Sequence, residues 1–418
     1  MSMLTPLNNR AYARLFSAHL VALIGTGLLT VALGLLAVDI GGTRAATIMG
    51  LAMSVKMIAY VFASPLMAAA VDRFDTKAVL IASDIIRAGI ALCLPFVTYA
   101  WQIYALIFIL QIASATFTPR FQALIPSLLD DEETYTQALS LSRLAYDTEA
   151  LLSPLLAAAL LTVTSYHNLF VGTAAGFVFS AACVASTALP AAARTPQPAQ
   201  GSFFHRAGIG LRTFRRSRAL TGLAWLNLAI AAPMSIVIVA TPDIVQNQLG
   251  RTQADVAILL AFFGIGSMAI ALILPRILAR TPQTGVMLAG AATAITGLLT
   301  MSSALLSTTH LSWPTLCLAW LITGAGLSAM LTPSSRLITQ HTTAEQRSTT
   351  FAAQFALSHA CYLITYPLVG FASSAIGIGP TITICTLIAG GAAIMAASIW
   401  WTNPCTAPHR TRKHLATA

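Results

Sequence analysis

Long apolar runs recur along almost the whole chain, and they restrict its possible folds more than any motif does. Each run is long enough to cross a lipid bilayer, which takes about 20 residues of helix. Backbone groups in lipid must hydrogen-bond within the protein, so spanning segments of this length are helices. The runs lie near residues 14–38, 45–71, 78–99, 101–126, 138–164, 167–190, 220–247, 254–279, 284–307, 312–338, 347–376 and 380–402. The sequence therefore predicts an all-α membrane protein with about twelve transmembrane helices.

Composition agrees with this prediction. Hydrophobic residues make up 57% of the 418 residues and charged residues only 9%, which is outside the range of soluble globular domains. The first apolar run follows Arg10 and Arg14 and continues to about Ala37, so we expect an uncleaved helix and not a signal peptide. The six cysteines form no CxxC pair, which argues against a disulfide framework or a thiolate metal site.

The positions of the basic residues predict the orientation of the chain. If both termini are cytoplasmic, 19 of the 23 Lys and Arg residues lie on the cytoplasmic side, whereas only Arg44 and Arg251 face outward. We therefore expect a multi-pass protein of a bacterial-type inner (cytoplasmic) membrane with both termini cytoplasmic. Orientation and contact with anionic membrane lipid account for the net charge of +10 and for the "RRSR" stretch at 215–218, so no nucleic-acid partner is expected.

A polar interruption and a repeat divide the chain into two halves. The expected parts are an N-terminal six-helix bundle at 1–190, a cytoplasmic linker at 191–219, a C-terminal six-helix bundle at 220–402 and a cytoplasmic tail at 403–418. The segment "TPRFQALIP" at 118–126 is echoed by "TPSSRLITQ" at 332–340. Two parallel six-helix halves are typical of a transporter architecture that binds substrate near the membrane midplane, between the halves.

The segment "AAAVDRFDTKAVL" at 68–80 resembles the signature that follows the second span in the major facilitator superfamily, Gly-x-x-x-Asp-Arg-x-Gly-Arg-Lys. Asp72, Arg73 and Lys77 match it, whereas two glycines and an arginine of the signature are replaced. The opening of the chain resembles the macrolide-efflux-like branch and, within it, the nickel-resistance exporters. The resemblance implies the major facilitator fold and a monomeric secondary transporter without a cofactor.

Span five carries three charged residues, Arg143, Asp147 and Glu149. At 100° per residue, Arg143 and Asp147 share one face of the helix with the spacing of an ion pair. They lie near the cytoplasmic end, where the Asp72 and Arg73 loop could neutralise them. We expect Asp72, Arg73, Lys77, Arg143 and Asp147 to form a gating loop region that clamps the structure without touching substrate.

Glu149 lies deeper in the span and has no opposite charge on its own face, so it should face a cavity. Aligning Pro154 with Pro367 maps Tyr146 onto His359 and Glu149 onto Tyr362 in the second half. An intramembrane Lys56 also needs a counter-charge, with Glu149 and Asp84 as candidates, although Asp84 is three residues from Arg87 and should pair with it. The predicted substrate and proton cavity is formed by Glu149, Tyr146, His359, Tyr362, Lys56 and His19.

Two interpretations stay open for neighbouring residues. His359 can be a cavity ligand or a residue that bonds only to a nearby helix. Met49, Met53, Met57 and Tyr60 share a face of span two with Lys56, and a methionine stripe of this kind is more often packing than a binding surface.

The cavity residues suit two kinds of substrate. His19, Glu149 and His359 offer ligands for nickel, cobalt or zinc, whereas a carboxylate among Tyr and Met residues suits an amphipathic organic cation. The tail "CTAPHRTRKHLATA" has only two histidines, unlike the histidine-rich end of some nickel exporters, and we assign no metal site from the sequence.

The sequence thus predicts a secondary active exporter. We expect proton-coupled antiport of a toxic small cation, either a divalent metal such as nickel or an amphipathic drug. In span five, Ser153, Pro154, Ala157 and Ala158 stand where proton-antiporting exporters have a glycine-rich kink. The alternatives are an exporter of a siderophore or another metabolite, and a membrane enzyme or channel. No HExxH, GxSxG or P-loop motif supports an enzyme.

The basic-residue asymmetry makes a prediction about topology. Reporter tags inserted at residue 200 and after the C-terminus should both be cytoplasmic, because the Lys and Arg bias requires it. Fusions to alkaline phosphatase, which is active only outside the cytoplasm, and to green fluorescent protein measure this. Phosphatase activity at either site would contradict the prediction.

Overall fold

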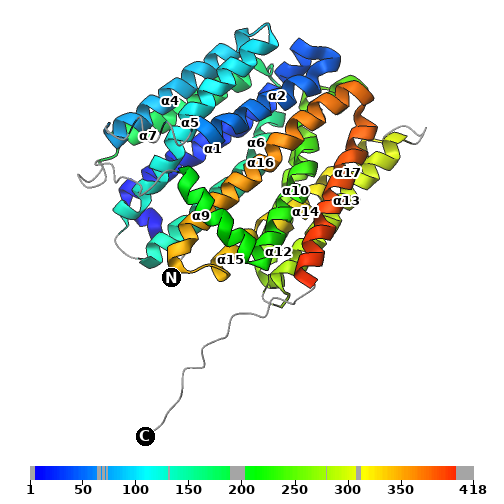
Figure 1. Cartoon of the computed structure of the whole chain (residues 1–418). Helices are drawn as coiled ribbons and strands as arrows, with labels where there is room; N and C mark the ends of the chain where they lie inside the picture. The colour runs from blue at the N-terminus through cyan, green and yellow to red at the C-terminus, as the bar shows by residue number, and fades with distance from the viewer. Residues whose placement is uncertain are drawn as a thin grey trace.

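The computed structural model describes residues 5–63, 67, 71, 74–129, 132–188, 203–278, 280–306 and 312–401. All regular structure in these residues is helical, and the helices form two bundles side by side (Figure 1). Ten stretches of the described residues are long and apolar enough to cross a membrane. The first stretch contains two successive spanning helices, and a shorter apolar segment in a further helix completes twelve. The predicted fold class is confirmed.

The first bundle holds the spanning helices of the N-terminal half. They are α1 (Arg10–Gly41), α2 (Ala45–Ile58), α4 (Thr76–Cys93), α5 (Ala100–Leu128), α6 (Glu132–Leu161) and α7 (His167–Ser186), with short helices η1 (Thr5–Asn8), η2 (Gly42–Arg44) and η4 (Leu94–Phe96) between or before them. Helix α2 continues into a π-helical turn, η3 (Ala59–Ala63).

The second bundle has a broken first helix. Its span consists of α10 (Arg218–Ser235), the π-helical turn η5 (Ile236–Ala240), α11 (Thr241–Asp243) and a second π-helical turn, η6 (Ile244–Gln248). The other members are α12 (Gln253–Leu278), α13 (Gln283–Leu306), α14 (Trp313–Leu331), α15 (Ser334–Gln340), α16 (Ala344–Ile376) and α17 (Ile378–Trp401). Helix α9 (Phe203–Arg216) lies within the segment predicted as a linker and packs on α16 and α10.

Polar residues and glycines define the helix ends. Asn9 caps α1 by accepting the backbone N–H groups of Ala11 and Tyr12, and Asp75 caps α4 by accepting that of Ala78. Gly42 and Gly377 follow the ends of α1 and α16 with φ of 50° and 86°, which favour glycine.

The two halves repeat the same packing. Helix α1 packs on α7 as α10 packs on α17, and α4 packs on α5 and α7 as α13 packs on α14 and α17. The halves meet through two equivalent pairs, α2 with α16 and α6 with α12. The beginning of α1, helix α9 and the end of α17 lie at one end of the molecule, called the lower end here (Figure 1). The upper end is the opposite one.

Apolar packing joins the halves at the upper end only, among the described residues. One cluster there draws on both halves, with members that include Leu33, Met49, Ile236, Leu316 and Val369. Toward the lower end each half has its own cluster, around Phe117 and Leu124 in the first and around Leu220 and Trp400 in the second. The halves are therefore packed together above and separate below.

Hydrogen bonds and close backbone contacts also join the halves at the upper end. The Thr47 hydroxyl donates to the Gly370 carbonyl at 2.9 Å and contacts the Ser374 hydroxyl at 2.6 Å. A Cβ added at Gly50 would lie 2.6 Å from the Tyr366 carbonyl oxygen, so glycine permits this crossing of α2 and α16.

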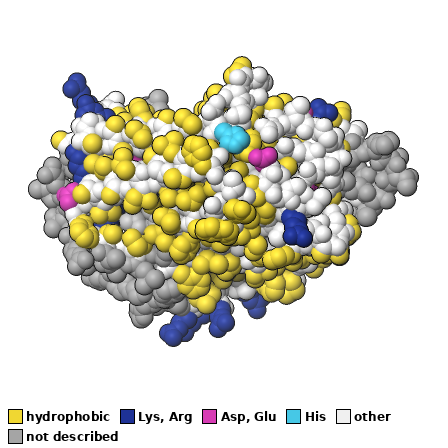
Figure 2. Space-filling view, turned by 90° about the horizontal axis from the view of Figure 1, so that it is seen from above, with side chains coloured by type: hydrophobic (Ala, Val, Ile, Leu, Met, Phe, Trp, Pro, Cys, Tyr) yellow, Lys and Arg dark blue, Asp and Glu magenta, His cyan; other side chains and the backbone are white. Residues whose placement is uncertain are grey.

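Basic side chains gather at the lower end. Those that the structure describes there are Arg10, Arg14, Lys77, Arg120, Arg212, Arg215, Arg216, Arg218, Arg276, Arg280 and Arg336. Arg44 and Arg251 lie at the upper end. Seen from above, hydrophobic and uncharged side chains cover most of the described upper surface, and charged ones are scattered (Figure 2).

Glycines in the second half allow α12, α13 and α14 to touch through their backbones. A Cβ at Gly324 would overlap the Phe263 carbonyl oxygen, and one at Gly326 would overlap the backbone nitrogen of Ala294. These helices cannot separate by the width of a methyl group without losing their contacts, so they form one rigid unit.

We predict that Gly324→Ala destabilises the protein by roughly 1–3 kcal/mol, because the added methyl group overpacks against backbone. The midpoint of thermal unfolding in detergent measures the change. The matched control is Gly391→Ala on α17, where nothing lies within 4 Å of the added Cβ. Equal unfolding midpoints for the two variants would contradict this packing.

Candidate functional site

A cluster of polar and aromatic side chains lies between α1, α2 with its turn η3, α6 and α16. We call it the central cluster, and its members are His19, Lys56, Tyr60, Tyr146, Glu149 and His359. Five of these six were predicted from the sequence as cavity residues. Tyr60 was placed on the same face of span two as Lys56 but was not named as a cavity residue.

Lys56 and Glu149 are the opposite charges of the central cluster. They lie close enough to interact electrostatically. Within the described part of the chain they form no ion pair within 4 Å, and neither head group donates or accepts a hydrogen bond. Both side chains are half-buried. The two charges thus interact electrostatically without direct contact, and both side chains keep part of their surface exposed.

Gly27 of α1 and Ser153 of α6 hold Glu149 close to α1. A Cβ at Gly27 of α1 would lie 2.6 Å from Glu149 Oε1 and would overlap Ser153 Oγ. The Ser153 hydroxyl donates to the Ile24 carbonyl at 3.2 Å, which ties α6 to α1. Pro154 follows directly inside α6, where it removes one backbone N–H from the helix.

Aromatic rings flank the charged pair on two sides. On the first side, His19 stacks on Phe121 with ring centroids 4.7 Å apart and meets the edge of Tyr146 at 5.6 Å. On the second side, Tyr60 lies 5.8 Å from His359, which also interacts electrostatically with Lys56. The rings therefore come from both halves of the molecule.

The hydrogen bonding of His359 fixes which nitrogen is available. Its Nδ1 lies 2.8 Å from the Phe355 carbonyl oxygen, so Nδ1 carries the proton and donates. In the neutral ring, Nε2 is then left with a lone pair. His359 stacks on Phe355 at 3.8 Å, and the phenylalanine ring joins the second aromatic group.

Tyr362 lies apart from this arrangement. It stacks on Tyr366, with centroids 5.2 Å apart, and packs against the upper apolar cluster. Met49, Met53 and Met57 are buried in the same cluster, which confirms that the methionines of span two are packing residues.

The structure gives no support to a metal centre. Among the residues that it describes, no group of three or more His, Cys, Asp or Glu side chains could hold a metal ion. His19 and His359 belong to the two different aromatic groups and are not brought together.

A second pair of charges lies inside the N-terminal half. Arg87 forms an ion pair with Asp84, as predicted, and both side chains are buried. The guanidinium of Arg87 lies over the rings of Phe117 and Phe177, 4.4 Å and 4.5 Å from their centroids. The two charges neutralise each other, although Asp84 Oδ2 and Arg87 Nε have no hydrogen-bond partner among the described residues, and Glu149 is left as the partner of Lys56.

The predicted gating loop is described in part. Lys77 donates to the Thr187 carbonyl at 2.9 Å and so ties the start of α4 to the end of α7. Asp72 and Arg73 lie outside the described residues, as do the side chains of Arg143 and Asp147. Their predicted role stays a prediction.

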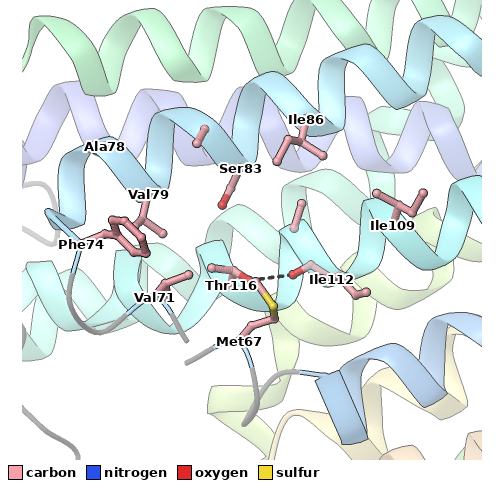
Figure 3. A pocket seen from close by; sticks show the side chains of 12 residues that line it. Met67, Val71, Phe74, Ala78, Val79, Ser83, Ile86, Ile109, Ile112 and Thr116 are labelled. Carbon is pink, nitrogen blue, oxygen red and sulfur yellow. Dashed lines mark hydrogen bonds between the residues drawn. The ribbon is translucent and has the colours of Figure 1, made fainter. Parts of the chain in front are cut away.

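A groove on the outside of the N-terminal half is unsuited to a cation. It has a volume of about 330 Å³ between α4, α5 and the segment before α4, and its lining is almost entirely apolar. Phe74, Val79, Ile86, Ile109 and Ile112 line it (Figure 3). The Thr116 hydroxyl there donates to the carbonyl of Ile112. Phe74, Ile86 and Ile109 are exposed on this surface, as expected of side chains that face lipid.

Two parallel helical halves that enclose a charged pair at their midpoint define a membrane transporter of the secondary class. The chain belongs to the Major Facilitator Superfamily, whose family model matches residues 15–311 and 223–416. It is accordingly a transporter and not an enzyme.

Comparison with individual proteins is consistent with this assignment. The chain is similar to Macrolide efflux protein A of Streptococcus pyogenes, with 26% identity over 186 residues, 43% of this chain and 46% of that protein. The Enterococcus faecalis protein of the same name is 26% identical over 185 residues, 42% of this chain and 57% of that protein. The match thus spans about half the length of these relatives. They support the macrolide-efflux-like resemblance, and not the nickel-resistance group.

Solved structures share the fold. A point mutant of the nucleoside transporter NupG superposes with a TM-score of 0.73 at 14% identity over 93% of this chain and 100% of its own. A bacterial homologue of the human lysosomal transporter Spinster gives a TM-score of 0.73 at 12% identity, over 95% of this chain and 98% of its own. At these identities the likeness concerns the fold alone.

We predict that Arg87→Met destabilises the protein by about 3–5 kcal/mol, because it leaves Asp84 buried without its partner. Thermal unfolding in detergent measures the effect, and the double variant Asp84→Asn/Arg87→Met should regain part of the loss. The control is Arg251→Met, which breaks the more exposed Arg251–Asp255 pair and should cost about 0–1 kcal/mol. A similar loss at both sites would argue against a structural ion pair at Asp84.

Proposed function

We propose that this transporter is a proton-coupled exporter of an amphipathic organic cation, and that Glu149 binds the cation and the proton in turn. The observation that carries the proposal is the placement of Lys56 and Glu149. These half-buried side chains interact electrostatically without a direct ion pair or hydrogen bond. A carboxylate without a direct cation partner inside a membrane protein is a functional site by default.

The pair can act as an exchange site. Without substrate, Lys56 or a proton balances the negative charge of Glu149. A cation that enters between the halves binds beside Glu149 and balances this charge instead. Because one carboxylate holds either a proton or the cation, binding of each expels the other. Because the site faces the two sides of the membrane in turn, the proton moves in down its gradient and the cation is carried out.

The surroundings favour an organic cation over a metal ion. Rings of Tyr60, Tyr146 and Phe355 lie around the charged pair, and aromatic faces attract organic cations. A transition metal would need several nitrogen or oxygen ligands in one place. The described residues offer no such group. Relatives named for macrolide efflux also support an organic substrate. Export of a siderophore or another metabolite remains the alternative proposal.

Basic residues support the proposed direction and location. The lower end, where the halves are separate, carries most of the described Arg and Lys residues, which is typical of a cytoplasmic face. We propose that this end opens to the cytoplasm in a bacterial-type inner membrane and that the substrate enters there. The loop at Asp72, Arg73 and Lys77, with Arg143 and Asp147 of α6, then lies at the cytoplasmic gate.

Glu149→Gln should abolish uphill transport while the shape of the binding site is kept, because glutamine cannot exchange a proton. The measurement is ethidium accumulation in inverted vesicles with an imposed pH gradient, and we expect at least a tenfold loss. Asp255→Asn at the upper rim is the control and should transport like the wild type. Accumulation by Glu149→Gln equal to that of the wild type would remove Glu149 from the mechanism.

Variants of the aromatic residues should separate the two substrate classes. For an organic cation, Tyr60→Ala should weaken ethidium transport several-fold more than His359→Ala does, because the attraction comes from an aromatic face. The same two variants assayed with nickel give the opposite order if a nitrogen ligand matters more. Nickel transport that depends on His359, with no ethidium transport by the wild type, would overturn the organic-cation proposal.

A further inference from the structure

A buried carboxylate lies at the upper contact between the halves, where the sequence pattern predicted no site. Asp243 is 8% exposed and ends the short helix α11. It is the one buried acidic side chain that the structure describes in the C-terminal half. Its partners are two amides, because Asn247 donates to Oδ1 at 2.7 Å and Gln248 donates to Oδ2 at 3.5 Å.

Asn247 connects this carboxylate to the other half of the molecule. Its Nδ2 also donates to the Gly42 carbonyl oxygen at 2.8 Å, and Gly42 follows α1 of the N-terminal half. An amide nitrogen carries two hydrogens, so the two bonds can exist together. The chain of contacts from Asp243 through Asn247 to Gly42 therefore crosses the interface between the halves.

Neighbouring contacts hold Asp243 in place. The Trp320 indole donates to the Thr241 hydroxyl at 3.1 Å. A Cβ added at Gly34 of α1 would lie 2.7 Å from the ring of Pro242, so α1 packs directly on this segment. The π-helical turn η6 then carries Asn247 toward Gly42. π-Helical turns are rare and often occur at functional sites.

The protonation of Asp243 decides how firmly the Asn247 amide is held. An ionised carboxylate only accepts hydrogen bonds, and its charge strengthens the one that Asn247 donates. A protonated carboxyl group keeps an acceptor oxygen but loses that charge, so it holds the amide less firmly. The Asn247 side chain is exposed, so its bond to the Gly42 carbonyl oxygen then competes with water.

We propose that Asp243 and Asn247 form a proton-dependent latch that holds the upper end of the transporter closed. With Asp243 ionised, Asn247 bridges the halves. When Asp243 is protonated the bridge is weakened, and the equilibrium moves toward the state with the upper end open. Asp243 acts through Asn247 and is thus a positioning residue. The latch does not involve Glu149, so a test of the latch is independent of the proposed exchange of proton and cation at Glu149.

No charge nearby replaces the proton in this role. The elements packed against α11 include α1, α2, α12, η5 and η6, and α14, which has no charged residue, contacts it through Trp320. We consider the described Asp, Glu, Lys, Arg and His side chains on these elements. They are Arg10, Arg14, His19 and Asp39 on α1, Lys56 on α2, and Asp255 and Arg276 on α12. None of them interacts electrostatically with Asp243, whose polar partners are the two amides. The ion pair of Asp255 is with Arg251, and Asp39 accepts a hydrogen bond from Tyr166.

Distances across the upper end test the latch without any transport assay. Spin labels at Val163→Cys and Ala375→Cys, both exposed and in opposite halves, report the separation by electron double resonance in a variant without the native cysteines. Lowering the pH from 8 to 5 should raise the open-to-closed ratio by about three- to tenfold, as expected for one hydrogen bond. Asn247→Ala should be open to the same extent at both pH values.

Matched variants separate the latch from general weakening. Asp243→Asn lacks the negative charge and cannot exchange a proton, so at both pH values it should show the open fraction that the wild type has at low pH. Thr47→Val removes the contacts of the Thr47 hydroxyl with Gly370 and Ser374 of the other half, and should raise the open fraction at both pH values while the pH effect persists. Gln248→Ala should behave as the wild type. A pH effect that survives in both Asn247→Ala and Asp243→Asn, or none in the wild type, would falsify the proposal.

Discussion

The cost of placing charge in a bilayer governs how this molecule is packed. Lys56 and Glu149 lie within spanning segments and form no direct ion pair, so each depends on water, a substrate or a proton for part of its stabilisation. Access for these partners requires that the two halves do not pack together along their full length. The apolar clusters have this distribution, with one that joins the halves at the upper end and two that stay separate below. The charged pair and the division of the core are thus parts of one arrangement.

Much of this fold could be predicted from the sequence because its signals are local. The length of each apolar run predicts a spanning helix, and the polar stretch around 191–219 together with the repeat predicts two halves. Lys56 and Glu149 were also accessible, since any charge in such a run demands a partner. The pairing of Asp84 with Arg87 followed from their spacing on one helix, and the structure contains it.

The remaining residues of interest depend on tertiary contacts that no local pattern reports. Spacing placed Tyr60 on the face of Lys56, but its contacts with Phe355 and His359 of the other half are tertiary. Repeat alignment placed Tyr362 opposite Glu149, whereas in the structure it stacks on Tyr366. Asp243 could have been found by the test applied to Glu149, as an acid inside an apolar run. Its link to Gly42 could not, because that contact joins residues 205 positions apart.

The π-helical turns in the first span of the C-terminal half have a consequence for how this segment tolerates change. Each turn holds more residues than an α-helical turn, and η5 and η6 flank Thr241, Pro242 and Asp243. Removing one residue from η6 would restore α-helical winding and rotate the rest of the span by about 100°. The tie between Trp320 and Thr241 would stay where it is, while the side chain at position 247 would leave the Gly42 carbonyl. Chain length in this segment is therefore as much a determinant of the interface as the identity of its side chains.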